Sequence, residues 1–215
     1  MKLTIVYDNI VHKKVKGLKS DWGFSCLIET DDVKLLFDTG AKARILLNNM
    51  KFLEIDPGLI NKIVISHEHW DHNGGLEKLS DHVNNIDLYR IDQKNAVNNM
   101  QIVSNSGSYK ITDKIFSTGT IEGSVDEQSL VLNGTKGFYL LLGCSHPGLE
   151  KILQKASEFG KIVGIIGGLH GFKDFTILKD FKFICPCHCT KYKKDIKDLY
   201  PADYVEGGVG KIIEI

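Results

Sequence analysis

Three histidines, a glutamate and an aspartate lie within one short stretch of this 215-residue chain, ISHEHWDHNGG at residues 65–75. His67 and His69 are one residue apart, so an extended backbone would place both side chains on the same side. Asp71 and His72 follow where the chain turns toward two glycines. Two imidazoles suit one metal ion, and a carboxylate with an imidazole suits a second. The stretch therefore predicts ligands for two metal ions. The alternative is a polar loop of solvated surface histidines.

Further histidines follow apolar segments and could complete the coordination of each ion. His146 comes after FYLLLGCS, His170 after IVGIIGGL and His188 after FKFICPC. Each segment has the length and composition of a buried strand. We expect these strand ends to converge on one edge of a sheet system. His12 and His82 lack this context, and we expect them to be solvated.

The surrounding segments predict the elements that position these residues. LTIVYDN and INKIVISH are typical of strands, and WGFSCLIET with DDVKLLFDTG predicts a hairpin with an Asp-Asp turn. QSLVLN and GFYLLLGCSH predict a second hairpin, with Asn133 and Gly134 at its turn. Helical spacing occurs in AKARILLNNMKFLEI, GLEKILQKASEFG and KYKKDIKDLY, and another helix is expected from about Gly75. Strands followed by helices in each half pack most simply as a two-layered β core flanked by helices.

The composition is typical of a soluble globular protein. Hydrophobic residues make up 42% and charged residues 25%, and 27 basic residues balance 27 acidic ones. We expect the first residues not to be a signal peptide, because MKLTIVYDNI turns polar after six residues, and no apolar run approaches the ~20 residues that span a bilayer. We expect a single domain over residues 1–215, located in the cytoplasm, with a small-molecule substrate and no nucleic-acid or membrane partner. The sequence leaves the oligomeric state open.

Five cysteines, three of them at Cys185, Cys187 and Cys189, fit reduced thiols better than a disulfide framework. A thiolate zinc site that includes Cys144 is an alternative. If the segment is extended, however, His188 faces away from Cys187 and Cys189 and cannot share a metal ion with them. The sequence also has no C-x-x-C pair. We therefore interpret the cysteines as small, buried packing residues.

The ordered motifs LLFDTG, ISHEHWDHNGGL, LLGCSHPG, IGGLH and PCHCT resemble those of the metallo-β-lactamase superfamily, and they cover nearly the whole chain. The last three are similar to a branch of metal-dependent hydrolases that includes a dihydropterin ribofuranosyl-aminobenzene phosphate synthase. This resemblance implies an α+β fold, namely a four-layer αββα sandwich of the metallo-β-lactamase type.

The resemblance also implies two sets of ligands for two divalent metal ions, which would be zinc, with iron or manganese as alternatives. The first-metal set is His67, His69 and His146, and the second-metal set is Asp71, His72 and His188. Asp38 matches an aspartate that lies behind the ligand histidines in the superfamily, where a carboxylate would fix the tautomer of an imidazole. The alternative for Asp38 is a turn-forming residue before Thr-Gly.

One motif departs from the superfamily pattern. An aspartate that bridges the two ions usually follows the strand that here reads KIVGIIGG, and this chain has Gly167, Gly168 and then His170. We expect His170 to line the pocket and act as a catalytic residue, with a purely structural histidine as the alternative.

The implied activity is hydrolysis of an ester, thioester, amide or phosphoester by a metal-activated hydroxide at a dinuclear site, with Asp71 as a second catalytic residue. The alternative is a pterin-phosphate synthase or transferase that uses the same metal site. A basic pocket around Lys173, Lys191, Lys193 and Lys194 would favour it. A third interpretation, a non-hydrolytic diiron protein, needs an electron partner, and the sequence has no flavin-binding domain.

Overall fold

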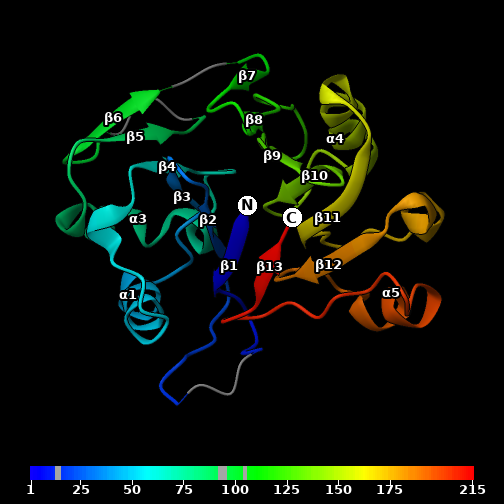
Figure 1. Ribbon diagram of the computed structural model, residues 1–215, viewed down its shortest axis with the longest axis horizontal. Coiled ribbons are helices and arrows are strands. Elements are labelled where there is room, and N and C mark those ends of the chain that lie inside the picture. The colour runs from blue at the N-terminus through cyan, green and yellow to red at the C-terminus, as the bar shows by residue number, and fades with distance from the viewer. Residues whose placement is uncertain (13–15, 92–95, 104–105) are drawn as a thin grey trace. The chain divides into compact units, whose positions relative to one another are not determined.

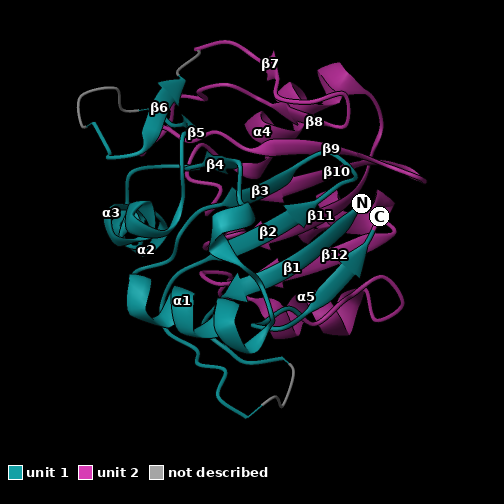
Figure 2. Cartoon of the chain, turned by 60° about the vertical axis from the view of Figure 1, so that its left-hand side comes forward, with its two compact units in different colours: residues 1–104, 207–214 teal, residues 105–206, 215 magenta. Residues whose placement is uncertain are grey.

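The computed structural model describes residues 1–12, 16–91, 96–103 and 106–215. The chain divides into two compact units, residues 1–104 with 207–214 and residues 105–206 with 215 (Figure 2). Each unit contains one mixed β-sheet and its own short helices (Figure 1). The α+β class is therefore confirmed, and the single domain over residues 1–215 remains a prediction.

Among its described residues, the first unit has a seven-stranded sheet in the order β13-β1-β2-β3-β4-β5-β6. The strands are β1 (Lys2–Tyr7), β2 (Ser25–Glu29), β3 (Lys34–Phe37), β4 (Lys62–Val64), β5 (Ile86–Tyr89), β6 (Met100–Val103) and β13 (Ile212–Glu214). Pairing is antiparallel from β13 to β3 and parallel from β3 to β6. The carboxyl ends of β3, β4 and β5 consequently lie at the same edge of the sheet.

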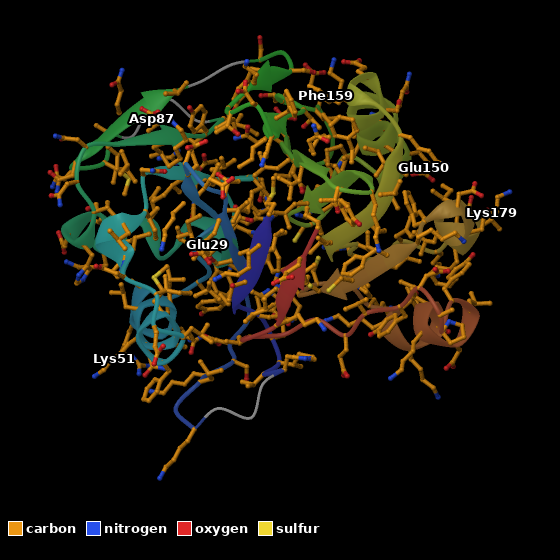
Figure 3. The ribbon with its side chains drawn as sticks, in the orientation of Figure 1. Glu29, Lys51, Asp87, Glu150, Phe159 and Lys179 are labelled. Carbon is orange, nitrogen blue, oxygen red and sulfur yellow. The ribbon has the colours of Figure 1, made fainter. Side chains whose placement is uncertain are left out.

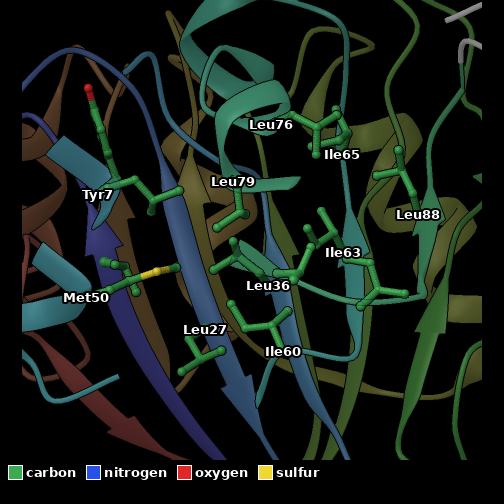
Figure 4. Close-up of a cluster of buried hydrophobic side chains, with 14 of the residues drawn as sticks. Tyr7, Leu27, Leu36, Met50, Ile60, Ile63, Ile65, Leu76, Leu79 and Leu88 are labelled. Carbon is green, nitrogen blue, oxygen red and sulfur yellow. The ribbon is translucent and has the colours of Figure 1, made fainter. Parts of the chain in front are cut away.

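In its described part, the first unit has three α-helices, of which the first and the third pack on its sheet through apolar side chains. They are α1 (Ala43–Phe52), α2 (Trp70–Asn73) and α3 (Leu76–Leu79), with 3-10 turns η1 (Pro57–Leu59) and η2 (Ser80–His82). Leu36, Ile63 and Leu88 of the strands share one buried cluster with Met50 of α1 and Leu79 of α3 (Figure 4). Burying one such side chain stabilises the folded state by about 1.5–3 kcal/mol. This cluster holds α1 and α3 against the sheet.

The second unit has, in its described part, a six-stranded sheet in the order β12-β11-β10-β9-β8-β7. The strands are β7 (Tyr109–Lys110), β8 (Ile115–Ser117), β9 (Leu130–Gly134), β10 (Gly137–Leu142), β11 (Ile162–Gly168) and β12 (Phe183–Cys187). The helices are α4 (Leu149–Ala156) and α5 (Lys193–Leu199), with 3-10 turns η3 (Ser157–Phe159) and η4 (Phe175–Asp180). β10, β11 and β12 are parallel, so their carboxyl ends share one edge.

The helices of the second unit cover its own apolar cluster. Leu140, Ile165 and Ile184 of the parallel strands pack with Ile152 of α4 and Ile196 of α5. Beyond α4, the rings of Phe159, labelled in Figure 3, and Phe116 of β8 lie 5.1 Å apart between centroids. The two clusters show that each unit buries an apolar core of its own.

One predicted turn is wrong. Asn133 and Gly134 pair with Phe138 and Gly137 in the β9–β10 ladder, and the turn consists of Thr135 and Lys136 instead. Close packing explains the glycine, because a Cβ at position 134 would lie 2.9 Å from the ring of Tyr139. The other predicted hairpin and the three predicted longer helices are confirmed. Every helix in the described part of the chain is too short or too polar to cross a membrane.

Candidate metal centre

The HEHWDH segment leaves β4 through a bend. The strand ends at Val64, and residues 66–68 bend, so the expectation of an extended segment is wrong. The bend nevertheless brings Nε2 of His67 to 3.1 Å from Nδ1 of His69. Two nitrogens bound tetrahedrally to one zinc ion, each at its usual bond length, lie about 3.3 Å apart. The spacing of this pair therefore fits two ligands of one ion.

Asp71 and His72 lie in the short helix α2 and complete the group of four candidate ligands in this unit. Both are buried. Oδ2 of Asp71 is 4.0 Å from Nε2 of His72, and the rings of His72 and His67 are 4.2 Å apart between centroids. The indole N–H of Trp22 donates to Oδ2 of Asp71 at 2.8 Å, which orients the carboxylate. The first unit thus brings together every candidate ligand that it carries.

Asp38 organises the far side of these rings. It is fully buried, and Oδ2 lies 2.7 Å from Nδ1 of His72. Ser66 donates its backbone N–H to Oδ1 at 2.7 Å and its hydroxyl to Oδ2 at 2.8 Å. Because the Ser66 hydroxyl donates to Asp38, it accepts from Nδ1 of His67, 2.9 Å away. Both imidazoles therefore carry their proton on Nδ1 and present the Nε2 lone pair toward His69 and Asp71. Asp38 is therefore not a solvent-facing turn residue.

Glu68 holds the HEHWDH segment from its other side. The buried guanidinium of Arg90, which follows β5, forms an ion pair with Glu68, and its Nε donates to Oε1 at 3.0 Å. Asn73 donates to Oε2 at 2.9 Å. Two glycines then let the segment pack closely, since a Cβ on Gly75 would lie 2.4 Å from the carbonyl oxygen of Thr39. Sequence reasoning missed Arg90, because a single arginine after a strand carries no motif.

In the second unit, a buried glutamate fixes the loop that carries His146. Glu127 is fully buried and accepts backbone N–H groups from three successive residues: Cys144 at 2.9 Å, Ser145 at 3.1 Å and His146 at 2.9 Å. Ser145 adopts a left-handed backbone with φ 64°, which turns the loop toward α4. Sequence reasoning missed Glu127, because an isolated acid before an apolar run gives no sign of being buried.

His170 and His188 lie beyond the ends of the neighbouring strands β11 and β12. His170 is exposed, has φ 46°, and its ring centroid is 5.1 Å from that of His146. Both rings line a pocket of about 240 Å³ whose wall also includes Leu149 and Phe172. His188 is buried, with φ 45° in the turn after β12. The three histidines therefore follow three parallel strands, with His170 and His146 in one pocket.

The cysteine segment is not extended at His188, so the expectation that His188 faces away from its neighbouring thiols had a wrong premise. Cys185 and Cys187 have sulfur atoms 3.9 Å apart within β12 and are fully buried. Cys144 is different, because its sulfur lies within 4.8 Å of a ring nitrogen of His146 and of a ring nitrogen of His188. One thiol therefore lies close to two candidate ligands.

The end of β11 presents backbone in place of an acidic side chain. Gly167 has φ 118°, and a Cβ there would lie 2.1 Å from the carbonyl oxygen of Leu142. A Cβ on Gly168 would lie 2.3 Å from the carbonyl oxygen of Gly143. Neither position accepts a side chain. The close contact of β11 with β10 therefore excludes an acidic residue at these two positions.

The predicted basic pocket is only partly formed. Nζ of Lys173 and Nζ of Lys191 lie 5.6 and 5.4 Å from the ring centroid of Tyr192, and the backbone N–H of Lys191 donates to the carbonyl of His170 at 2.9 Å. Lys193 and Lys194, by contrast, belong to the first turn of α5. None of these lysines lines the 240 Å³ pocket. His12 and His82 are both exposed, as expected.

Sequence comparison finds a family match over part of the chain and archaeal relatives over most of it. The family described as anti-Pycsar protein Apyc1 matches residues 18–95. An uncharacterized protein of Methanocaldococcus jannaschii is 27% identical and is aligned over 99% of this chain and 100% of its own length. The 7,8-dihydropterin-6-methyl-4-(beta-D-ribofuranosyl)-aminobenzene-5'-phosphate synthase of the same organism is 27% identical, over 91% of this chain and 90% of its own.

Solved structures share the fold over the full chain. Tm1679, a metal-dependent hydrolase of the beta-lactamase superfamily, has a TM-score of 0.75 at 24% identity. The match covers 100% of this chain and 99% of Tm1679. Zinc-bound PqqB from Methylobacterium extorquens has a TM-score of 0.64 at 10% identity, with 100% of both chains covered. Two mixed sheets with short helices, the ordered motifs and these likenesses agree: the chain has the metallo-β-lactamase fold.

Proposed function

We propose that the chain is a metal-dependent hydrolase that binds two divalent metal ions, zinc in the first instance. The observation that carries this proposal is the hydrogen-bonded group of Asp38, Ser66, His67 and His72, which is buried and directs the Nε2 lone pairs of both imidazoles toward His69 and Asp71. A ligand imidazole whose second nitrogen donates to a carboxylate is the usual arrangement at protein metal sites. The donor set of imidazole and carboxylate suits zinc, iron or manganese.

The ligand assignment follows the sequence motifs. The first-metal set is His67, His69 and His146, and the second-metal set is Asp71, His72 and His188. The similarity to a metal-dependent hydrolase and to a zinc-bound protein of the same fold supports this assignment. A small-molecule substrate, no nucleic-acid or membrane partner and a cytoplasmic location belong to the same proposal.

Two bound ions would polarise the substrate and lower the pKa of a water molecule toward neutrality. The residues of this chain supply the remaining tasks. Asp71, oriented by Trp22, accepts a proton from the attacking water. His170, in the pocket beside His146, donates a hydrogen bond or a proton to a substrate oxygen. The substrate class in this proposal is an ester, thioester, amide or phosphoester.

A second candidate is a pterin-phosphate synthase or transferase that uses the same metal site. Its support is the synthase of Methanocaldococcus jannaschii, which is aligned over 91% of this chain. Lys173 and Lys191, which both follow His170 in the sequence and lie close to Tyr192, offer two cationic groups for a phosphorylated substrate. This candidate predicts activity that depends on a phosphorylated pterin precursor.

Metal analysis of the purified full chain tests the proposal. We expect about two zinc equivalents per chain, and loss of at least one in the His67→Ala/His69→Ala double variant. The His12→Ala/His82→Ala variant is the matched control, since both residues are exposed and lie outside the proposed ligand sets. Assays with phosphodiester, phosphomonoester, thioester and lactam substrates would then separate hydrolase from synthase. Unchanged zinc content in the first double variant would refute the ligand assignment.

A further inference from the structure

Cys144 lies among candidate metal ligands, although the sequence alone favours a packing role for it. Its sulfur is within 4.8 Å of a ring nitrogen of His146 and of a ring nitrogen of His188. A thiolate and an imidazole bound tetrahedrally to one zinc ion, at the usual Zn–S and Zn–N lengths, place sulfur and nitrogen about 3.6 Å apart. The observed limit of 4.8 Å is about 1.2 Å longer than this separation, for either histidine.

The loop that carries Cys144 is already fixed in place. Glu127 accepts the backbone N–H groups of Cys144 and of the two residues that follow it. Thr190, which follows β12, fixes the turn that contains His188. Its hydroxyl donates to the carbonyl of Cys187 at 2.8 Å and accepts the N–H of Leu169 at 2.9 Å. Pre-organisation of this kind is typical of ligand loops, whose geometry must be held to about 0.5 Å.

The site of the second unit also has no carboxylate from β11. The backbone of Gly167 and Gly168 packs against β10 so closely that neither position accepts a side chain. Two divalent ions surrounded mainly by neutral imidazoles need further negative charge, and a thiolate supplies one unit of it. Cys144, at the end of the adjacent strand β10, is the residue placed to provide this charge.

We propose that Cys144 is a metal ligand that binds as a thiolate, together with His146 or His188. The inference rests on the proposed metal site. On binding, the thiol releases its proton to solvent and the sulfur forms a bond to the ion, so no oxidant or further reactant takes part. A thiolate is a soft ligand, so the site takes zinc or ferrous iron in preference to manganese or magnesium.

Cobalt substitution tests this inference directly, because a cobalt–thiolate bond adds charge-transfer absorption in the near ultraviolet. The metal-free full chain would be titrated with Co²⁺ and, separately, with Zn²⁺. We expect the absorption band in the unaltered chain and in Cys26→Ser, whose buried thiol lies in β2. In Cys144→Ser we expect loss of the band and at least a tenfold weaker affinity for Zn²⁺. An intact band and unchanged affinity in Cys144→Ser would overturn the inference.

X-ray absorption at the zinc edge of the unaltered chain provides a readout that needs no variant. A scattering shell at about 2.3 Å is expected for a Zn–S bond, in addition to the shorter Zn–N shell. Two bound zinc ions with nitrogen and oxygen neighbours alone would overturn the role of Cys144 and leave the proposed function standing. Binding of neither Zn²⁺ nor Co²⁺ by the unaltered chain would overturn the proposed function itself.

Discussion

Asp38 in the first unit and Glu127 in the second are fully buried carboxylates, and each accepts several hydrogen bonds from a segment that carries candidate ligands. They differ in what they hold. Asp38 contacts the imidazole of His72 itself, whereas Glu127 accepts three successive backbone N–H groups of the loop that carries His146. The first carboxylate therefore acts on the electronic character of a ligand, and the second acts on the position of a loop. The same residue chemistry thus tunes a ligand in one unit and shapes the backbone in the other.

Glu127→Ala gives the largest expected effect on stability. It leaves three buried backbone N–H groups without their acceptor, and each such group costs about 1–3 kcal/mol. We expect the free energy of unfolding to fall by about 3 kcal/mol or more in urea titrations. Glu127→Gln is the matched control, because its amide keeps one acceptor oxygen and should retain part of the stability. Equal, small losses in both variants would show that Glu127 does not hold the loop.

Asp38→Ala should act chiefly on metal binding. Loss of the carboxylate behind His72 is expected to weaken zinc affinity by ~10–100-fold without emptying the site, as found for partners of ligand imidazoles. Competition with a chromogenic chelator would measure the change. The zinc affinity of Asp38→Asn should lie between that of the unaltered chain and that of Asp38→Ala. If Asp38→Ala lowers stability and leaves the zinc affinity unaltered, the contrast with Glu127 is wrong.

His170→Ala sharpens the comparison, because His170 lines the pocket beside His146 and is proposed to act on the substrate instead of on a ligand or a loop. Turnover of any hydrolysed substrate is expected to fall roughly tenfold or more, the size typical of losing one acid–base or anchoring group. Zinc content should be retained. His170→Asn is a useful second variant, because asparagine tolerates the left-handed backbone observed at this position. Full turnover in both variants would reduce His170 to a structural residue.

Replacement of Asp21 should have the smallest effect on stability. Its carboxylate is partly exposed, in contrast to the buried carboxylates of Asp38 and Glu127. A hydrogen bond from Lys42 lowers the pKa of its carboxyl group, with Nζ 2.8 Å from Oδ2. A pKa that is lower in the folded state adds stability above the unfolded value of about 3.9, and this stability is lost as the pH falls through the folded value. Asp21→Asn should therefore cost less than about 1 kcal/mol at pH 7 and nothing in strong acid. Equilibrium unfolding at both pH values would measure this difference.

The sequence predicted the fold well, because motif spacing and strand periodicity are local signals, and the ligand assignment stays a prediction. The positions of His67, His69, Asp71 and His72 after β4 followed from one apolar strand and one turn. The bend at residues 66–68 could not be predicted, since it depends on hydrogen bonds from distant residues. The β9–β10 turn was predicted two residues too early, and the close packing of Gly134 against Tyr139 is a contact that the Asn-Gly pair alone does not reveal.

The supporting residues were harder to predict than the ligands. Trp22, Arg90 and Glu127 each act through one or a few hydrogen bonds across 17 or more positions of sequence. Nothing in their local sequence marks them, since a single charged or aromatic residue fits a surface equally well. Pairings of this kind are set by tertiary packing, so one sequence read along its length does not reveal them.

Four non-glycine residues of the two candidate regions have a left-handed backbone, with φ 58° at Asp38, 64° at Ser145, 46° at His170 and 45° at His188. Conformations of this kind cost on the order of 1 kcal/mol each for a residue with a Cβ. Glycine would remove that cost at every one of them and would also remove the side chain. Relief of backbone strain at these positions would therefore remove the side chains proposed to carry the chemistry, which makes them poor targets for thermostability engineering.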